Sequence, residues 1–184
     1  MSETAYRTTP LFGGAITADI PASWKDVSDF RHVPDTQEVW VSPDTSAEGE
    51  ISFILEVLEH VEPERPEDAI KFHFEALAED NSAESHSVDR IWTSSTPSTS
   101  AQTPSPTLLA GTQSVRKYGR QSAAPAPVQI YVALWRYPQR KTDLVMSFNV
   151  AGVASSTSAQ QAAVLATFER AASSLALVDA NLFG

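Results

Sequence analysis

The chain contains no cysteine and no long apolar run. Without cysteine, disulfides and thiolate chemistry are excluded, and the composition indicates a reducing compartment. No apolar stretch approaches the roughly 20 residues that span a bilayer. The first ten residues, MSETAYRTTP, show neither the basic segment nor the apolar core of a secretory signal. We therefore expect a soluble intracellular protein.

Basic residues are also scarce. The sequence has 13 Lys and Arg against 23 Asp and Glu, which gives a formal net charge of −10 and a pI near 4.7. Such a surface disfavours nucleic acid, because duplex binding relies on Lys and Arg at phosphates, and it equally disfavours anionic membrane. A basic protein partner fits the sign, although many proteins are acidic only for solubility. A length of 184 residues with 42% hydrophobic residues predicts one globular domain over 1–184.

Several catalytic and ligand-binding motifs are missing. The pair Gly13-Gly14 is not followed by the Lys-Ser/Thr of a phosphate-binding loop, and no GxSxG elbow occurs. No histidine belongs to an HExxH or HxxxH pair, so a zinc site on one helix is not expected, and His73 reads as a packed core residue. We expect no cofactor and no metal. The histidines are His32, His60, His73 and His86.

Apolar periodicity predicts the main elements. Strands are expected within 11–21 and over 38–42, 51–61, 128–137 and 143–150, with a single helical turn over 24–30. The polar loop 138–142 predicts an antiparallel hairpin between the last two strands. A helix over 65–81 would begin at Pro66 and bury Ile70, Phe74 and Leu77. A second helix over 158–175 shows capping-box spacing at Ser158 and Gln161, and its buried stripe would be Val164, Leu165, Phe168, Ala172 and Leu175.

The strand 128–137 is apolar on both faces, which requires cover on both faces. The sequence therefore predicts an α+β fold, a three-layer α/β/α sandwich with a mainly antiparallel sheet. One segment is biased: Ser, Thr and Pro dominate 94–106. We expect a flexible loop that spaces two strands and contributes nothing to a core, with phosphorylation as an alternative role.

The stretch RHVPDTQEVWV places Asp35 and Glu38 around a proline turn before a strand. Three interpretations are open. Proline and aspartate are ordinary turn residues, so the carboxylates can be simple solvent-facing groups. They can also form part of a surface that another protein binds, or a general acid/base pair, which would need a cleft and shifted pKa values. The residues alone favour the first interpretation.

At this stretch the sequence resembles the Ran guanine-nucleotide release factor family, the Mog-type nuclear import factors. The resemblance rests on PLFGGA and DVSDFRHVPDTQEVWV, and then on KFHFEALAEDN, ALWRYPQRKTDLVMSFNV and the tail LVDANLFG, so it extends from Leu11 to Gly184. It implies a Mog/PsbP-like fold. It also implies a protein that binds the small GTPase Ran and promotes release of its guanine nucleotide without covalent catalysis, in support of nuclear import. A location in nucleus and cytoplasm would follow.

In that family the acidic residues of the VPDxQE motif contribute to Ran binding, and they fall here on Asp35 and Glu38. The resemblance extends this site to the neighbouring acidic residues and to the rest of the motif, which are Asp26, Asp29, Pro34, Thr36 and Gln37. We expect a monomer that binds Ran, with a further Ran-binding protein as a possible third component.

Two other functions stay open. The chain can be an adaptor that holds GTP-loaded Ran without accelerating release, since the same acidic surface serves both functions. A small-ligand module or enzyme has support only in the aromatic residues of the sheet, Tyr131, Trp135 and Tyr137, and aromatic residues at strand spacing are typical of a core.

Overall fold

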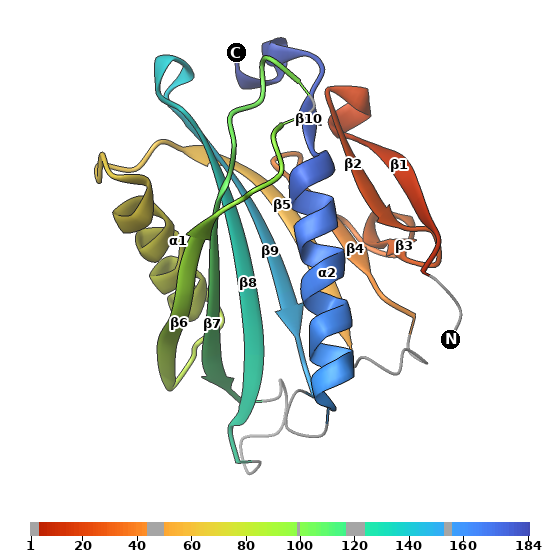
Figure 1. Cartoon of the computed structure of the whole chain (residues 1–184), viewed down its shortest axis with the longest axis vertical. Helices are drawn as coiled ribbons and strands as arrows, with labels where there is room; N and C mark the ends of the chain where they lie inside the picture. Colours follow the sequence, from red (N-terminus) through yellow and green to blue (C-terminus); the bar gives the residue numbers. More distant parts are fainter. Residues whose placement is uncertain (1–3, 44–49, 99, 117–123, 153–155) are drawn as a thin grey trace.

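The structure is a computed structural model that describes residues 4–43, 50–98, 100–116, 124–152 and 156–184. It is built around a seven-stranded antiparallel sheet with the strand order β3-β4-β5-β9-β8-β7-β6 (Figure 1). The bounds of these strands are β3 Lys25–Asp26, β4 Gln37–Val41, β5 Ile51–Glu59, β6 Ser85–Thr93, β7 Thr107–Val115, β8 Ala126–Tyr137 and β9 Thr142–Val150. A second sheet has the order β1-β2-β10, from β1 Tyr6–Leu11, β2 Ile16–Pro21 and β10 Ala176–Leu177.

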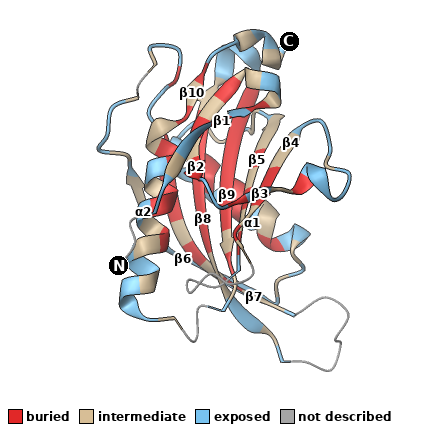
Figure 2. Ribbon diagram, turned by 90° about the vertical axis from the view of Figure 1, so that its right-hand side faces the viewer, coloured by how far each residue is buried: buried red, intermediate tan, exposed pale blue. Residues whose placement is uncertain are grey.

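Two helices cover opposite faces of the large sheet (Figure 2). Helix α1, Pro66–Asp80, packs on β6, β7 and β8 through Ile70 and Phe74. Helix α2, Ser158–Ser174, packs on β2 and β8 through Phe168, so α2 and the small sheet cover the other face. The predicted three-layer arrangement with a mainly antiparallel sheet is confirmed, and the small sheet is an addition that the sequence did not indicate.

Most predicted elements are present. Strands β2, β4, β5, β8 and β9 lie where alternation placed them, and the helical turn is the 3-10 helix η2, Val27–Asp29. Residues 138–141 join β8 to β9 as an antiparallel hairpin, with a 3-10 helix η3, Pro138–Arg140, and Thr142 of the predicted loop is the first residue of β9. Pro66 is the first residue of α1, as predicted.

The capping box of α2 differs from the prediction by one residue. The side chain of Thr157, not Ser158, accepts from the backbone N–H of Gln160, and the Gln160 side chain accepts from the N–H of Thr157. The predicted pair at Ser158 and Gln161 was wrong because two Ser/Thr and two Gln follow one another, so spacing alone cannot choose the register. Leu165 in the predicted stripe is half-buried.

The segment 94–106 joins β6 to β7, as expected of a spacer between strands. The expectation that nothing in it enters a core was wrong. Thr103 is buried, and its Oγ1 accepts a hydrogen bond of 2.8 Å from the backbone N–H of Leu177. A threonine can be buried here because its hydroxyl satisfies a buried amide at the start of the C-terminal tail.

Candidate functional site

The acidic turn that the sequence singled out connects η2 to β4 at the edge of the large sheet. The turn closes on itself, since the N–H of Gln37 donates to the carbonyl of Pro34 at 2.9 Å. It is fastened to β5 by the N–H of Val57, which donates to the carbonyl of Thr36 at 3.0 Å. Pro34, Asp35 and Thr36 are exposed. The turn therefore presents its tip to solvent from a fixed backbone.

The two aspartates before the turn have different environments. Asp26 caps η2, because its Oδ1 accepts from the N–H and the Oγ of Ser28 at 2.8 and 2.7 Å. Asp29 is exposed at the end of the same 3-10 helix. The first is a structural cap that fixes the approach to the turn, whereas the second is presented to solvent.

Glu38 is held inside the site. It is half-buried, and its Oε1 accepts from the backbone N–H of Phe12 at 2.5 Å. Burial raises the pKa of Glu38; the Phe12 hydrogen bond opposes this rise, and the charge of Asp26 adds to it. The Glu38 carboxylate thus holds a loop that is distant in sequence, although burial disfavours its own ionised form.

The loop that Glu38 braces is the left-handed turn η1, Phe12–Gly14. Its φ angles are +49° at Phe12, +65° at Gly13 and +94° at Gly14. Glycine adopts such angles without the steric cost that other residues meet, which explains the Gly-Gly pair. Phe12 carries that cost, and the hydrogen bond to Glu38 holds it in place.

The residue before Glu38 points to the opposite face of the sheet. Gln37 pairs with Glu56 across β4 and β5, and its Nε2 donates to the Glu56 carboxylate at 2.5 Å. Neighbouring residues of a strand face opposite sides, so Glu38 and Gln37 contact different layers. The turn is therefore braced from both faces of the sheet.

A groove of about 390 Å³ lies at this edge of the sheet, between η1, η2 and the turn. It brings together five of the predicted site residues, namely Asp26, Pro34, Asp35, Gln37 and Glu38. Asp29 and Thr36 do not line it. The same groove is lined by Phe12 and Gly13, which the sequence analysis did not assign to the site.

Phe30 is a feature of this region that the sequence analysis missed. Its side chain is 71% exposed, more than any other large apolar side chain among the described residues. It follows exposed Asp29, and the exposed Arg31 comes next. The available signal was a lone aromatic in a polar stretch, outside any apolar period. Exposed aromatics of this kind are typical anchors of protein interfaces.

The two ends of the resembling sequence meet beside η1. The carbonyl of Ala15 accepts from the N–H groups of Val178 and Asp179 at 2.8 and 3.1 Å. Strand β10 pairs with β2 just before this contact. PLFGGA, VPDTQEV and the start of the tail thus form one continuous chain of contacts, although they are far apart in sequence.

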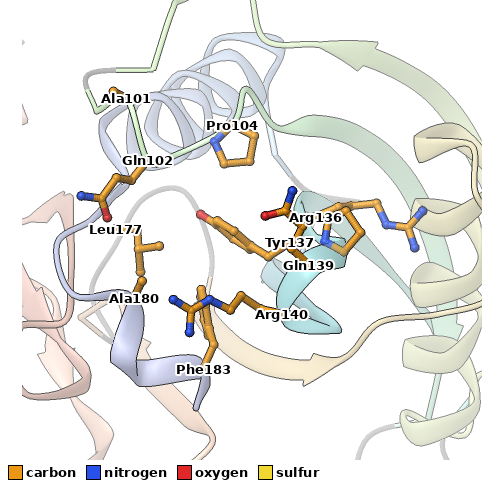
Figure 3. Close-up of a pocket in the computed structure, with 11 residues that line it drawn as sticks. Ala101, Gln102, Pro104, Arg136, Tyr137, Gln139, Arg140, Leu177, Ala180 and Phe183 are labelled. Carbon is orange, nitrogen blue, oxygen red and sulfur yellow. The ribbon is translucent and has the colours of Figure 1, made fainter.

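A separate pocket of about 380 Å³ lies at the turn of the β8–β9 hairpin (Figure 3). It is formed by the 94–106 segment, the hairpin and the tail, whose Phe183 contacts Tyr137 with ring centroids 4.9 Å apart. Burial raises the pKa of Tyr137 to about 12, with a lesser, opposing effect from Thr103. In Figure 3, Arg136 extends away from Arg140, so their charges do not converge on the pocket.

The aromatic residues that supported a small-ligand site lie in two different environments. Tyr131 and Trp135 are buried in the core, as their strand spacing indicated, while Tyr137 lines the pocket just described. Arg140 donates to the carbonyl of Gly184 at 2.9 Å. We interpret the pocket as the junction of three segments of the chain, namely the 94–106 segment, the β8–β9 hairpin and the tail.

A buried ionic cluster includes Arg136, which also lines this pocket. Asp143 is fully buried and contacts His60 Nδ1 at 2.8 Å, His73 Nε2 at 2.9 Å and Arg136 Nε at 3.1 Å. Burial alone would raise the pKa of Asp143, but hydrogen bonds from His73, from the Val61 N–H and from Arg136 lower it to about 2. His73 is thus a packed core residue, as predicted. Within the described residues no group of three His, Cys, Asp or Glu is placed to hold a metal ion.

The described part of the chain contains no helix that is both long and apolar enough to cross a bilayer. The exposed turn, its acidic groove and the neighbouring exposed Phe30 make up the candidate functional site.

Comparison with known proteins first defines the class. The structure superposes on the Ran-binding protein Mog1p of Saccharomyces cerevisiae with a TM-score of 0.77 and 29% identity, covering 99% of this chain and all of that one. The protein is therefore an α+β protein of the Mog1 fold.

The family follows from the sequence. Residues 9–151 match the family model described as Ran-interacting Mog1 protein. The chain is 34% identical to the Ran guanine nucleotide release factor of Danio rerio, over 95% of this chain and 98% of that one, and 34% identical to the human protein of the same name, over 97% of each. The nuclear import protein mog1 of Schizosaccharomyces pombe is 29% identical, over 94% and 98%. The chain belongs to the Mog1 family.

Proposed function

We propose that this protein binds the GTPase Ran and promotes release of its guanine nucleotide, in support of nuclear import. The observation that carries the proposal is that relatives matching nearly the whole chain are named Ran guanine nucleotide release factor and nuclear import protein. The protein acts without covalent catalysis, as a monomer, in nucleus and cytoplasm, and a further Ran-binding protein can join the complex.

The proposed interface is the acidic turn together with Phe30. Asp29 and Asp35 supply exposed negative charge at positions that flank Phe30 in the sequence. Complementary charge chiefly speeds association and fixes register, whereas a buried aromatic anchor slows dissociation. Pro34, Thr36 and Gln37 shape the turn that presents these groups, and Asp26 fixes η2 before it.

Glu38 has a double role in this proposal. Its carboxylate lines the groove, and the same group holds Phe12 in η1. A partially desolvated carboxylate with a raised pKa gains from an arriving cation, because the cation favours its charged form. A basic side chain of Ran would meet Glu38 at the floor of the groove and Asp35 at its rim.

Accelerated release of the nucleotide from Ran would follow from thermodynamic linkage between two binding equilibria. If the protein binds Ran more tightly when the nucleotide is absent, it must weaken nucleotide binding by the same factor. A coupling of about 3 kcal/mol corresponds to roughly 150-fold. An adaptor would instead bind nucleotide-loaded and nucleotide-free Ran equally, and release would not accelerate.

The test measures release of a fluorescent GTP analogue from Ran as the protein is titrated. Asp35→Lys and Phe30→Ser change exposed side chains, so both variants should fold, and each should lower the apparent affinity for Ran about tenfold or more. Glu75→Lys makes the same charge change on the outer face of α1 and serves as the matched control, with an effect below twofold.

Three results contradict the proposal or part of it. Binding without acceleration would establish the adaptor. Acceleration that Asp35→Lys and Phe30→Ser leave intact would move the interface elsewhere. No binding at all, with circular dichroism showing a folded protein, would remove Ran as the partner.

A further inference from the structure

A second groove lies on the other side of the turn, between α1 and β5, with a volume of about 240 Å³. It exists because α1 packs on β6, β7 and β8 and leaves the face of β5 beside it uncovered. Half-buried Leu58 and Leu77 and buried Val145 line it. Phe72 stands at its edge with 50% of its side chain exposed.

The ionisable side chains that line this apolar floor are three carboxylates and one buried histidine, His73, which is hydrogen-bonded to Asp143. Glu56, Glu59 and Asp80 line the groove, and none of the described residues that line it is Lys or Arg. Burial raises the pKa of Glu56; its hydrogen bond from Gln37 opposes the rise, the nearby charge of Asp80 adds to it, and His73 has a smaller lowering effect. The free groove therefore contains acidic groups that repel one another, and a cation would relieve that repulsion.

Size and chemistry exclude several occupants. The volume is below the roughly 300–1,000 Å³ of typical small-ligand pockets. A second copy of this chain would bring another net charge of −10 toward the acidic rim. An apolar floor inside an acidic rim fits an apolar anchor side chain with basic neighbours, which is the pattern of an amphipathic helix or peptide that binds in a groove.

We propose that the groove between α1 and β5 docks a basic peptide segment of a partner protein. The segment places an apolar side chain against Leu58, Leu77 and Phe72, and its Lys or Arg side chains face Glu56, Glu59 and Asp80. This surface is separate from the edge groove that holds Glu38. The inference does not depend on the proposed function, because it rests on the shape and charge of this groove.

The experiment uses the full chain as bait for a random 12-residue phage-displayed peptide library. Enriched peptides are synthesised with a fluorophore, and their affinities are measured by anisotropy for the wild type and for three variants. Phe72→Ser removes an exposed apolar wall, Asp80→Lys reverses a rim charge, and Glu75→Lys makes the same reversal outside the groove on the same helix. Circular dichroism checks that each variant folds.

The expected peptides carry a bulky apolar residue between Lys or Arg residues. Phe72→Ser and Asp80→Lys should each weaken their binding at least about tenfold, equivalent to about 1.4 kcal/mol, while Glu75→Lys changes it less than twofold. Nucleotide release from Ran should stay within twofold of wild type in both groove variants, so this proposal and the proposed function can fail separately.

Several outcomes would overturn the inference. Enrichment of acidic or purely polar peptides, or of none, would do so. So would equal weakening by Glu75→Lys, which would show attraction to net charge rather than to the groove. Loss of the stimulated nucleotide release from Ran in the groove variants would show that this groove belongs to the Ran interface and is not a separate surface.

Discussion

Replacing Asp143 by Asn should destabilise the protein more than any acid-to-amide change at its surface. The carboxylate is fully buried and receives hydrogen bonds from His60, His73, Arg136 and the N–H of Val61. An asparagine of the same size would turn an NH₂ group toward donors. It would also leave the Arg136 guanidinium, which is only 12% exposed, without its counter-charge.

The magnitude follows from the pKa. A fall from the ordinary 3.8 to about 2 corresponds to about 2.5 kcal/mol of stabilisation of the charged form. Removing one partner of a buried ion pair costs about 3–5 kcal/mol. We therefore expect Asp143→Asn to lower the free energy of unfolding by about 3 kcal/mol, which for a domain of this size lowers Tm by about 6–12 °C.

The pH dependence has a definite sign. Because the folded pKa is depressed, the stabilisation from Asp143 is fully present above its ordinary pKa and is lost as pH falls toward 2. Urea unfolding followed by tryptophan fluorescence should show the wild-type advantage at pH 7 and its decline between about pH 5 and pH 2. Asp35→Asn, an exposed change of the same chemistry, should alter stability by less than about 0.5 kcal/mol. A cost below 1 kcal/mol at pH 7, or a pH-independent one, would refute the reasoning.

Two further substitutions test contacts that the sequence did not reveal. Glu38→Gln keeps an acceptor for the Phe12 N–H and removes a carboxylate whose pKa is raised by burial, so the urea midpoint at pH 7 should not fall. Any gain in stability should vanish below about pH 4.5, because Glu38 is then itself neutral. Glu38→Ala removes the acceptor and should cost about 1–2 kcal/mol. Thr103→Val removes the acceptor of the Leu177 N–H, so it should lower the free energy of unfolding by about 1–2 kcal/mol and speed hydrogen exchange at the Leu177 amide. Ser105→Ala, an exposed change in the same segment, should alter neither the stability nor the exchange rate.

The parts of the fold that the sequence predicted are those with the densest apolar pattern. β5, β8 and β9 are central strands, and their alternation reflects two buried faces. β6 was missed because it is an edge strand in which no residue is fully buried, so burial imposes no pattern on SHSVDRIWT. β7 was missed partly because Gly111 interrupts its strand pattern. Glycine is needed at this position because an added Cβ would lie 2.6 Å from the ring of Phe74.

The candidate site likewise contains residues whose position the sequence predicted and residues whose position it did not predict. The exposure of Asp35 follows from local turn chemistry, and the structure agrees. The inward role of Glu38 does not follow, because its partner Phe12 is 26 residues away and must adopt a left-handed conformation for its N–H to reach the carboxylate. Thr103 likewise depends on a contact with the distant tail. Sequence patterns report local structure and burial, whereas these contacts depend on how separate layers meet.

Three of the five stretches that carry the family resemblance have different structural roles. The exposed turn can meet a partner directly through Phe30 and Asp35, whereas the Gly-Gly loop contacts that turn through Glu38 and the tail contacts the loop through Ala15. A turn held in one conformation loses less entropy on binding than a mobile one. Under the proposed function the tail supports the turn through this loop, so substitutions in the tail should weaken binding without removing a contact with the partner, whereas Phe12 and Gly13 of the loop also line the groove.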